Sequence, residues 1–539
     1  MSLAVRGASL PHDVIHTIAT LVDRADLPPV LLTNRHMNKL LTPVLYATID
    51  LGAWDNIKQC LRTLTAPAES FACGRDLAGL VRTFKLRRPL TRLPYYVSKA
   101  SLAEDVLRIV ARMRNLRSFS SSVWLGEQSS EILYTLLSGS SPLLRSIDMH
   151  AGYAPPLSLQ DLDTCKWKEA AFQGLPSLHS LKLEAFDSLS AGHMVLLQTL
   201  FAACAPTLRS LSLQCRPKAE VWTSVLPPHA IFSSLQALEI DGNALAHPSL
   251  AHAAGVRSLK VTSAWDTAHA PPSDIFPGLS ELSCPRTLVP TFLPERTAHR
   301  RPIQVIRVDN VSLERSDGWH SRDEHPPTCS DLLPVFACLQ NSAVPVTSLS
   351  FQVERITDGE LELLRQALQA LEYLAINVTQ KAPQHTDTEL LSFFVWNLVS
   401  YLPRLHTFLV GGGKGPWYTK PLTVAQLERL ARISIFFQDE VLRPAIEQCP
   451  PSLRRIACLT DSLELFREED GWHWFAGVFL RDGHGFVHEI KPGPFRWWEE
   501  EDAIEVRTPE HSVNGDVEIM EEDSSDSELD TRFLPRSDD

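Results

Sequence analysis

Residues 202–213 read AACAPTLRSLSL, and this phrase decides the fold because close copies of it recur along the chain. Its leucines have the spacing L-x-x-L-x-L, so Leu211 and Leu213 fall on one face of an extended strand and the residues around them on the other. Pro206 stops a helix-like stretch over 194–204. We therefore predict a unit of helix, turn and short strand whose leucines face a core.

Fourteen candidate copies of this spacing lie between residues 81 and 458, and most start 21 to 30 residues after the previous one. One copy, 235–245, fits the full leucine-rich-repeat template including its asparagine, Asn243. Any leucine-rich globular protein contains the spacing by chance, but fourteen copies, several with the same proline approach, favour a repeat solenoid. The interval from Ile303 to Val346 is 43 residues, which predicts an inserted loop on the rim. The copies begin at Val81, Leu116, Leu144, Leu178, Leu208, Leu235, Val256, Leu279, Ile303, Val346, Leu371, Leu405, Leu430 and Leu453.

The N-terminal stretch 10–51, LPHDVIHTIATLVDRADLPPVLLTNRHMNKLLTPVLYATIDL, has a different pattern. Apolar residues at helical spacing predict a first helix after Pro11, a second that Asp26 caps, and a third that leads into a strand at 49–51. Three helices in about 40 residues enclose little core by themselves. Apolar side chains left over on this bundle therefore predict a docking surface.

This stretch resembles an F-box of fungal type, through Leu10-Pro11, Asp13-Val14-Ile15, Asp26-Leu27, Asn34-Arg35 and the exit TPVLYATIDL. The resemblance implies binding to the Skp-type adaptor of a cullin–RING ubiquitin ligase. The aromatic residue common in the third helix of such modules is replaced around His36-Met37, which implies weaker adaptor binding. A plain helical cap on a solenoid is the alternative interpretation. By resemblance, the adaptor contacts are Leu10, Pro11, Val14, Ile15, Ile18, Leu27, Leu31 and Leu32.

The formal net charge of −13 is concentrated in the last 41 residues. Residues 499–539 contain 16 acidic and 3 basic side chains, which leaves 48 of each sign in 1–498. A neutral body argues against nucleic-acid binding, and the acidic, apolar-poor tail is predicted to be disordered.

Ten cysteines without a C-x-x-C pair, no signal-like N-terminus and no apolar run of about 20 residues indicate a cytoplasmic or nuclear protein away from membranes.

Candidate catalytic and ligand sites are weak. Gly411–Gly415 resembles a phosphate loop, but Lys414 is followed by Gly415 and Pro416, so no hydroxyl is present for magnesium. The cluster from His320 to Cys329 has no zinc spacing. No motif of a hydrolase, metalloprotease or thiol oxidoreductase occurs, and we predict neither an enzyme nor a bound cofactor or metal.

The strand residues between the leucines are predicted to line the concave face of the solenoid, where a folded protein or peptide would bind. We nominate Lys182, Lys260 and Arg307 as substrate-binding residues, although a solvated sheet face explains the mixture of side chains equally well. The whole set is Lys182, Glu184, Ser210, Ser212, Gln214, Glu239, Asp241, Lys260, Thr262, Arg307, Asp309, Tyr373 and Asn377.

The predicted fold class is α/β: a three-helix F-box-like module over 1–51, then an irregular leucine-rich-repeat solenoid over 52–498 with a parallel sheet on its concave face. A hairpin at about 472–490 closes the last repeat, and 499–539 form the disordered acidic tail. The resemblance implies a substrate receptor of a Skp–cullin–F-box ubiquitin ligase, with an unidentified protein substrate. A repeat scaffold without a ligase role is the alternative.

Overall fold

The computed structural model describes most of the repeat region and part of the N-terminal module. Contacts divide the chain into two units, 1–495 and 496–539, and all described residues belong to the first. The described residues are 15, 17, 19, 26–33, 35–52, 54–67, 76–87, 99–123, 128–150, 177–186, 191–215, 222, 225–227, 229–245, 247–262, 275–295, 300–308, 329–353, 356, 358–378, 393–412, 449–458, 463–468, 471–481 and 487–495.

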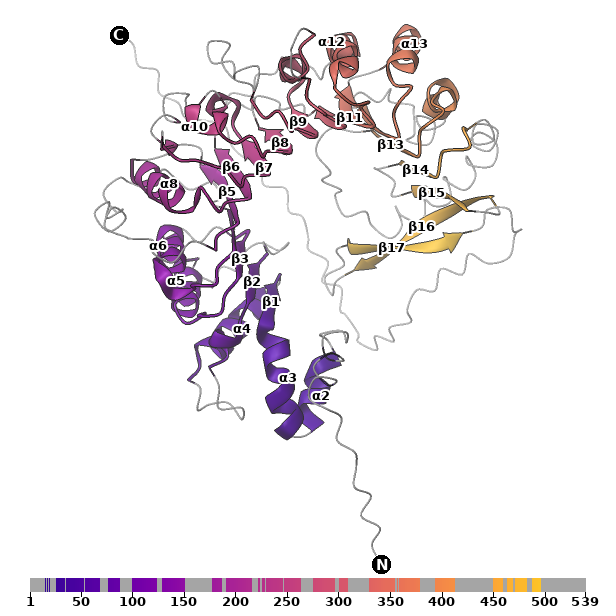
Figure 1. Cartoon of the computed structure of the whole chain (residues 1–539). Coiled ribbons are helices and arrows are strands. Elements are labelled where there is room, and N and C mark those ends of the chain that lie inside the picture. The colour runs from indigo at the N-terminus through magenta and orange to yellow at the C-terminus, as the bar shows by residue number, and fades with distance from the viewer. Residues whose placement is uncertain are drawn as a thin grey trace, which may run out of the picture. The chain divides into compact units, whose positions relative to one another are not determined.

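A parallel sheet organises this unit (Figure 1). Within the described ranges, strands β1 to β14 lie in chain order, and each is parallel to the next. Their order confirms the predicted α/β class and its parallel sheet. The strands are β1 (Thr48–Leu51), β2 (Thr83–Leu86), β3 (Ser118–Ser121), β4 (Ser146–His150), β5 (Ser180–Phe186), β6 (Ser210–Cys215), β7 (Ala237–Ile240), β8 (Ser258–Val261), β9 (Glu281–Cys284), β10 (Val305–Val308), β11 (Ser348–Val353), β12 (Tyr373–Val378), β13 (Thr407–Gly412) and β14 (Arg455–Cys458).

Thirteen of the fourteen sequence copies coincide with a strand, and the copy at Leu430 lies outside the described residues. The strands alternate as the spacing predicts, with one face half-buried or exposed and the other buried. Neighbouring buried positions stack in register, as Phe84 and Phe119 do with ring centroids 6.0 Å apart. The recurring leucine spacing therefore sets both the register and the side of the core.

Strand β1 extends the sheet at its N-terminal side. It follows the helical stretch directly and is parallel to β2, with Ile49 opposite Phe84. The chain thus passes from the N-terminal helices into the repeat sheet without a separate linker.

The C-terminal end of the sheet is antiparallel. Strand β15 (Leu463–Glu468) pairs with β14, β16 (Gly471–Arg481) with β15, and β17 (Val487–Phe495) with β16. The predicted hairpin falls on β16 and β17, whereas β15 has no counterpart in the sequence prediction.

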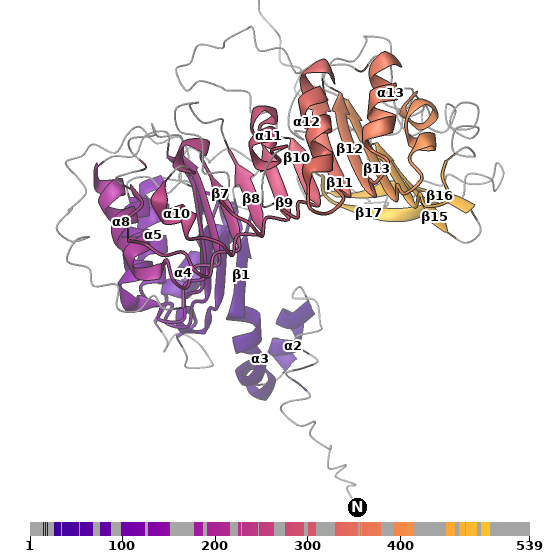
Figure 2. The ribbon, with the colours of Figure 1, turned by 45° about the horizontal axis from the view of Figure 1, so that its top comes forward.

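Helices cover one face of the sheet (Figure 2). Aromatic contacts join the two layers: Phe336 of α12 meets Phe351 of β11 edge-on at 5.5 Å, and Phe394 contacts Phe408 of β13 at 6.1 Å. The other face of the sheet has no such layer within the described ranges. The helices are α2 (Leu27–Thr33), α3 (Arg35–Ala47), α4 (Trp54–Thr65), α5 (Lys99–Val110), α6 (Gln128–Thr135), α8 (Ala191–Cys204), α10 (Pro248–Ala251), α11 (Val289–Phe292), α12 (Leu333–Cys338) and α13 (Asp358–Ala367), with short 3-10 or π turns at 78–80, 136–140, 242–244, 286–288, 329–332, 339–341 and 399–401.

Side-chain hydroxyls join successive repeats just before the strands. Thr207 donates to the carbonyl of Leu178 at 3.0 Å, Ser177 to Leu144 at 3.0 Å, and Ser452 to Leu405 at 3.0 Å. Each hydroxyl satisfies a backbone carbonyl of the preceding repeat. Since asparagine is mostly absent from the copies, these hydroxyls provide the cross-repeat contacts here.

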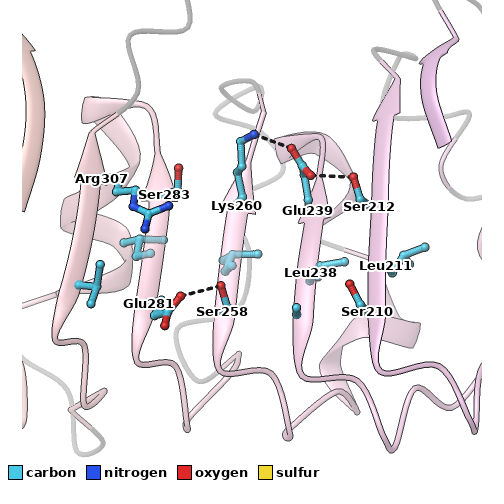
Figure 3. Close-up of a pocket in the computed structure, with 14 residues that line it drawn as sticks. Ser210, Leu211, Ser212, Leu238, Glu239, Ser258, Lys260, Glu281, Ser283 and Arg307 are labelled. Carbon is cyan, nitrogen blue, oxygen red and sulfur yellow. Dashed lines mark hydrogen bonds and ion pairs between the residues drawn. The ribbon is translucent and has the colours of Figure 1, made fainter. Parts of the chain in front are cut away.

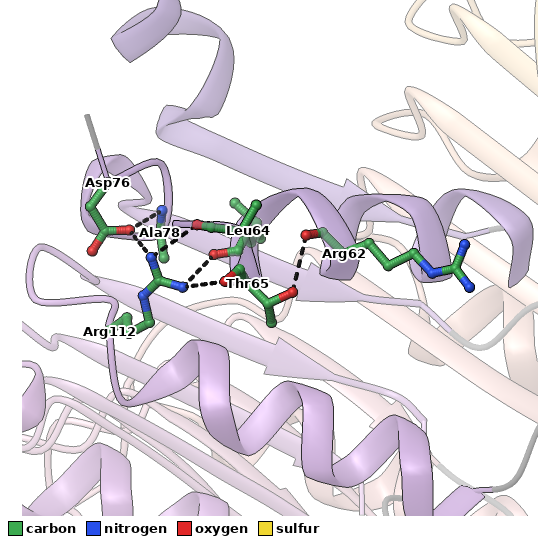
Figure 4. A network of polar contacts seen from close by, with 7 residues as sticks. Arg62, Leu64, Thr65, Asp76, Ala78 and Arg112 are labelled. Atoms are coloured by element: carbon green, nitrogen blue, oxygen red, sulfur yellow. Dashed lines mark hydrogen bonds and ion pairs between the residues drawn. The ribbon is translucent and has the colours of Figure 1, made fainter. Parts of the chain in front are cut away.

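Arg112 ties the first two repeats together (Figure 4). Its guanidinium donates to the carbonyls of Leu64 at 3.0 Å and Thr65 at 2.9 Å, which are the last residues of α4. It also pairs with Asp76 at 2.8 Å, whose carboxylate accepts the backbone N–H of Ala78 at 3.2 Å. A cation at the C-terminus of a helix stabilises both its free carbonyls and its dipole.

Arg301 performs a similar task in the middle of the chain, where it is buried with 3% of its surface exposed. It donates to the carbonyl of Ile275 at 2.9 and 3.0 Å and to that of Phe292, the last residue of α11, at 2.7 Å. Its guanidinium also lies over the Phe292 ring at 5.6 Å.

No helix among the described residues is long and apolar enough to cross a membrane.

Candidate functional site

The N-terminal helices form a small core of their own. Ala19, Leu27, Leu31 and Leu41 are buried together. The partly buried side chains around them are Ile15, Met37, Leu40, Val44 and Leu45. Helix α2 contributes Leu27 and Leu31, one turn apart, so its inner face is fixed against α3.

The outer face of α2 is apolar and exposed. The helix reads LPPVLLT, and its residues Pro28, Pro29, Val30 and Leu32 are all exposed. Leu32 has 83% of its surface exposed, more than any other large apolar side chain in the described residues. An apolar helix face left in solvent is typical of a docking surface.

The eight predicted adaptor contacts thus fall into three groups. Leu27 and Leu31 are core residues, which hold α2 in place, and Ile15 packs against the same core. Leu32 points into solvent. Leu10, Pro11, Val14 and Ile18 lie outside the described residues.

On the solvent-facing side of the sheet, the three nominated cations lie in one row. Pairing in register runs from Lys182 of β5 through Ser212, Glu239, Lys260 and Ser283 to Arg307 of β10. With adjacent strands about 4.8 Å apart, Lys182 lies about 14 Å from Lys260, and Arg307 lies about 10 Å beyond. Lys260 and Arg307 line one shallow depression of about 220 Å³ (Figure 3), which Lys182 does not reach.

Glu239 is the centre of a polar cluster in this depression. Its carboxylate accepts from the Ser212 hydroxyl at 2.7 Å and the Gln214 amide at 2.9 Å, and Lys260 lies 2.6 Å away. The side chain of Glu239 is 17% exposed, so its charge is held by three donors rather than by water. The cluster is therefore a fixed part of the surface.

The other charges of the row differ in their pairing. Lys182 lies 4.0 Å from Asp148 on the neighbouring strand. Arg307 is exposed and forms no ion pair within the described part of the chain. Of the three cationic side chains, that of Arg307 is therefore the most available to an anionic group of a partner.

Alternation misplaces Asp241, which lies just beyond β7. Asp241 was expected among the exposed side chains, but it is buried and its carboxylate accepts the N–H of Asn243 at 2.9 Å. The chain leaves the strand at Ile240, so the period of two no longer applies. The same carboxylate caps the short turn 242–244.

Several other predictions lie on residues that the structure does not describe. These are the side chain of Glu184, Asp309, the cluster His320 to His325, residues 413–416 after β13, and the acidic tail 499–539. Gly411 and Gly412 are the last residues of β13. In the described ranges, no three His, Cys, Asp or Glu side chains are grouped as metal ligands.

Sequence reasoning also missed residues. Glu281 of β9 accepts from the Ser258 hydroxyl at 3.1 Å in the same depression. Glu281 is the third residue of its copy, the position that Ser210 and Ser258 occupy in theirs, so the leucine spacing could have revealed it. Arg112 and Arg301, which hold helix ends, carry no such positional signal.

Comparisons with known proteins add little. No family model matches the chain, and no curated protein matches it. Among solved structures, one similar chain is from the "Crystal structure of Rad7 and Elc1 complex in yeast", at 12% identity and a TM-score of 0.32, covering 79% of this chain and 99% of that one. The fold and the recurring leucines define an α/β repeat protein.

Proposed function

We propose that this chain is a substrate receptor of a Skp–cullin–F-box type ubiquitin ligase. The N-terminal helices would bind the Skp-type adaptor and, through it, the cullin–RING core. The solvent-facing side of the repeat sheet would bind a protein substrate. The observation that carries this proposal is the exposed apolar face of α2, on which Leu32 is the most exposed large apolar side chain.

An apolar face of this kind supports helix-to-helix docking on a partner. Burying one leucine side chain on association is worth about 1.5–3 kcal/mol, so loss of Leu32 would weaken adaptor binding by a measurable factor. Leu27 and Leu31 would act by holding the helix, since both are buried against α3 and its neighbours.

The sheet supports the second half of the proposal. Its row from Lys182 to Arg307 offers hydroxyls and both signs of charge, which suits a polar protein segment. Ubiquitin transfer would be performed by the partners, and this chain would contribute proximity. No catalytic role is assigned to any of its residues. We expect this function to be exercised in the cytoplasm or the nucleus.

The experiment is co-purification of the full chain with a Skp-type adaptor. We expect the wild type to capture the adaptor, and a Leu10→Asp, Ile18→Asp double variant to lose it, because charge at an apolar contact is costly to bury. If the double variant captures the adaptor as the wild type does, the F-box assignment is wrong. If the folded wild type captures none, the chain is a repeat scaffold without a ligase role.

A further inference from the structure

A column of arginines lies at the N-terminal ends of the strands. In each repeat, one residue directly precedes the strand, and in the first half of the sheet this residue is mostly arginine. The residues preceding β2 to β8 are Arg82, Arg117, Arg145, His179, Arg209, Gln236 and Arg257.

Backbone hydrogen bonds fix these residues as direct neighbours. The N–H of Arg117 donates to the carbonyl of Arg82 at 2.7 Å, and that of Arg145 to Arg117 at 2.8 Å. The series continues through His179 to Arg209, with 2.8 Å at both steps. Since neighbouring strands lie about 4.8 Å apart, the backbone positions of Arg82 and Arg209 are about 19 Å apart along one line.

The guanidinium groups of this column are not neutralised. All five arginines are exposed, and none forms an ion pair within the described residues. Two acids on the adjoining sheet face are already paired, Asp148 with Lys182 and Glu239 with Lys260, and Glu281 accepts from the Ser258 hydroxyl. The series is interrupted after Arg257, because the equivalent residues before β9 to β13 are Ser280, Gln304, Thr347, Glu372 and His406, and arginine returns before β14 as Arg454.

Small hydroxyl residues run beside the column. The first residues of β3 to β6 are Ser118, Ser146, Ser180 and Ser210, each half-buried; an arginine precedes all of them except Ser180, which follows His179. Their hydroxyls form no side-chain hydrogen bond within the described residues. Guanidinium forks and hydroxyl donors together are the groups that bind carboxylates.

We propose that this column, Arg82 to Arg257, binds an extended acidic segment of a protein partner. Like charges on neighbouring strands destabilise a sheet, and an anionic partner would offset that repulsion. An extended peptide that crosses the strands would place alternate carboxylates on one side, about 6–7 Å apart. Neighbouring positions of the column are about 4.8 Å apart, and long arginine side chains can adjust to this difference.

Nucleic acid fits the column less well than a peptide. Single-stranded nucleic acid is bound by cations together with aromatic side chains on which bases stack. The exposed aromatic residues with large side chains in the described ranges are Trp396 and Tyr401, which belong to the segment before β13. The column itself contains guanidinium, imidazole, amide and hydroxyl groups. This inference does not depend on the ligase role.

The test is binding of fluorescent probes to the full chain, followed by anisotropy. The probes are an oligo-glutamate peptide, an oligothymidylate of equal charge, and a neutral glycine–serine peptide. We expect oligo-glutamate to bind most tightly, with an affinity that falls as salt is added because exposed charges are screened. The variant Arg117→Glu, Arg145→Glu should weaken that binding about tenfold or more, since two attractions become repulsions.

The matched control is Arg62→Glu, Arg108→Glu, which changes the charge equally on exposed positions of α4 and α5. We expect it to bind oligo-glutamate as the wild type does, and thermal unfolding to show all variants folded. Unchanged binding by the Arg117, Arg145 variant, or no binding of oligo-glutamate by the wild type, overturns the proposal. Tighter binding of oligothymidylate that the same variant abolishes assigns the column to nucleic acid instead.

Discussion

The Lys260 ammonium lies 2.6 Å from the Glu239 carboxylate, across two neighbouring parallel strands. This pair is one of a series on the solvent-facing side of the sheet, where Asp148 and Lys182 are related in the same way. An acid on one strand and a lysine on the next neutralise each other locally. Cations with no acid opposite them on a neighbouring strand, such as Arg307, are therefore the ones whose charge is available to a partner.

The Glu239–Lys260 pair is expected to contribute little to stability. Lys260 is half exposed, and exposed ion pairs contribute about 1 kcal/mol or less. A double-mutant cycle with Glu239→Gln and Lys260→Met, measured by urea unfolding, should give a coupling free energy below about 1 kcal/mol. A coupling of about 3 kcal/mol would show that the pair is desolvated and structural, which would remove it from the binding surface.

Arg301 is expected to be far more important for stability than the residue beside it. Replacing Arg301 with methionine removes the guanidinium donors to the carbonyls of Ile275 and Phe292, at a cost of about 3 kcal/mol or more. Arg300→Met is the control, since Arg300 is exposed and should change the free energy of unfolding by about 0.5 kcal/mol or less. Equal effects in chemical unfolding would contradict the role assigned to the buried guanidinium.

These adjacent arginines show where sequence reasoning fails. The letters ERTAHRRPIQ (295–304) do not distinguish the buried Arg301 from the exposed Arg300, because a charged residue is placed in a core by its hydrogen bonds and not by hydropathy. The leucine spacing, in contrast, predicted strands correctly because burial on one face of a strand has a fixed period. Register and core side then follow from the same pattern.

Helix α2 illustrates the same limit at the candidate site. Its sequence LPPVLLT is apolar all round, so periodicity cannot separate the buried Leu31 from the exposed Leu32. Packing against α3 determines that Leu31 is buried and Leu32 is exposed. Strand β1 was expected from the sequence, but its pairing with β2 was not, since pairing depends on neighbours that are distant in the chain.

Two glycines in the approach to the strands should respond differently to substitution. A Cβ on Gly255 would lie 3.0 Å from the carbonyl oxygen of Leu235, whereas one on Gly278 would lie 3.7 Å from that of Ala254. Gly255→Ala should therefore lower the free energy of unfolding by about 1 kcal/mol or more, because the backbone of the preceding repeat must shift. Gly278→Ala should be neutral or raise it by about 0.5 kcal/mol, through the entropy of the unfolded chain. Urea unfolding of both variants checks this, and the reverse order would contradict the packing described.

His247 should make the fold sensitive to acid. Burial lowers the pKa of His247 below its ordinary value, and its Nδ1 accepts the N–H of Ser249 at 3.2 Å at the start of α10. The unfolded chain therefore takes up this proton at a higher pH than the folded one, so stability falls as the pH decreases from about 6.5 towards the folded pKa. The variant His247→Asn keeps a hydrogen-bond acceptor at the N-cap of α10 and removes the titratable imidazole.

The measurement is urea unfolding at about pH 7.5 and about pH 5. Wild type should lose more stability between the two pH values than His247→Asn does. Equal losses would mean that other groups determine the acid response.

The most direct test of the account is the dissociation constant between the full chain and a purified Skp-type adaptor, by titration calorimetry. Leu32→Asp should weaken binding about thirtyfold or more, which corresponds to about 2 kcal/mol, because an exposed leucine on α2 would be a central contact. Leu143→Asp replaces another exposed leucine, in the repeat region, and should leave the constant unchanged. Equal binding by wild type and Leu32→Asp would contradict the central claim that the outer face of α2 recruits the adaptor.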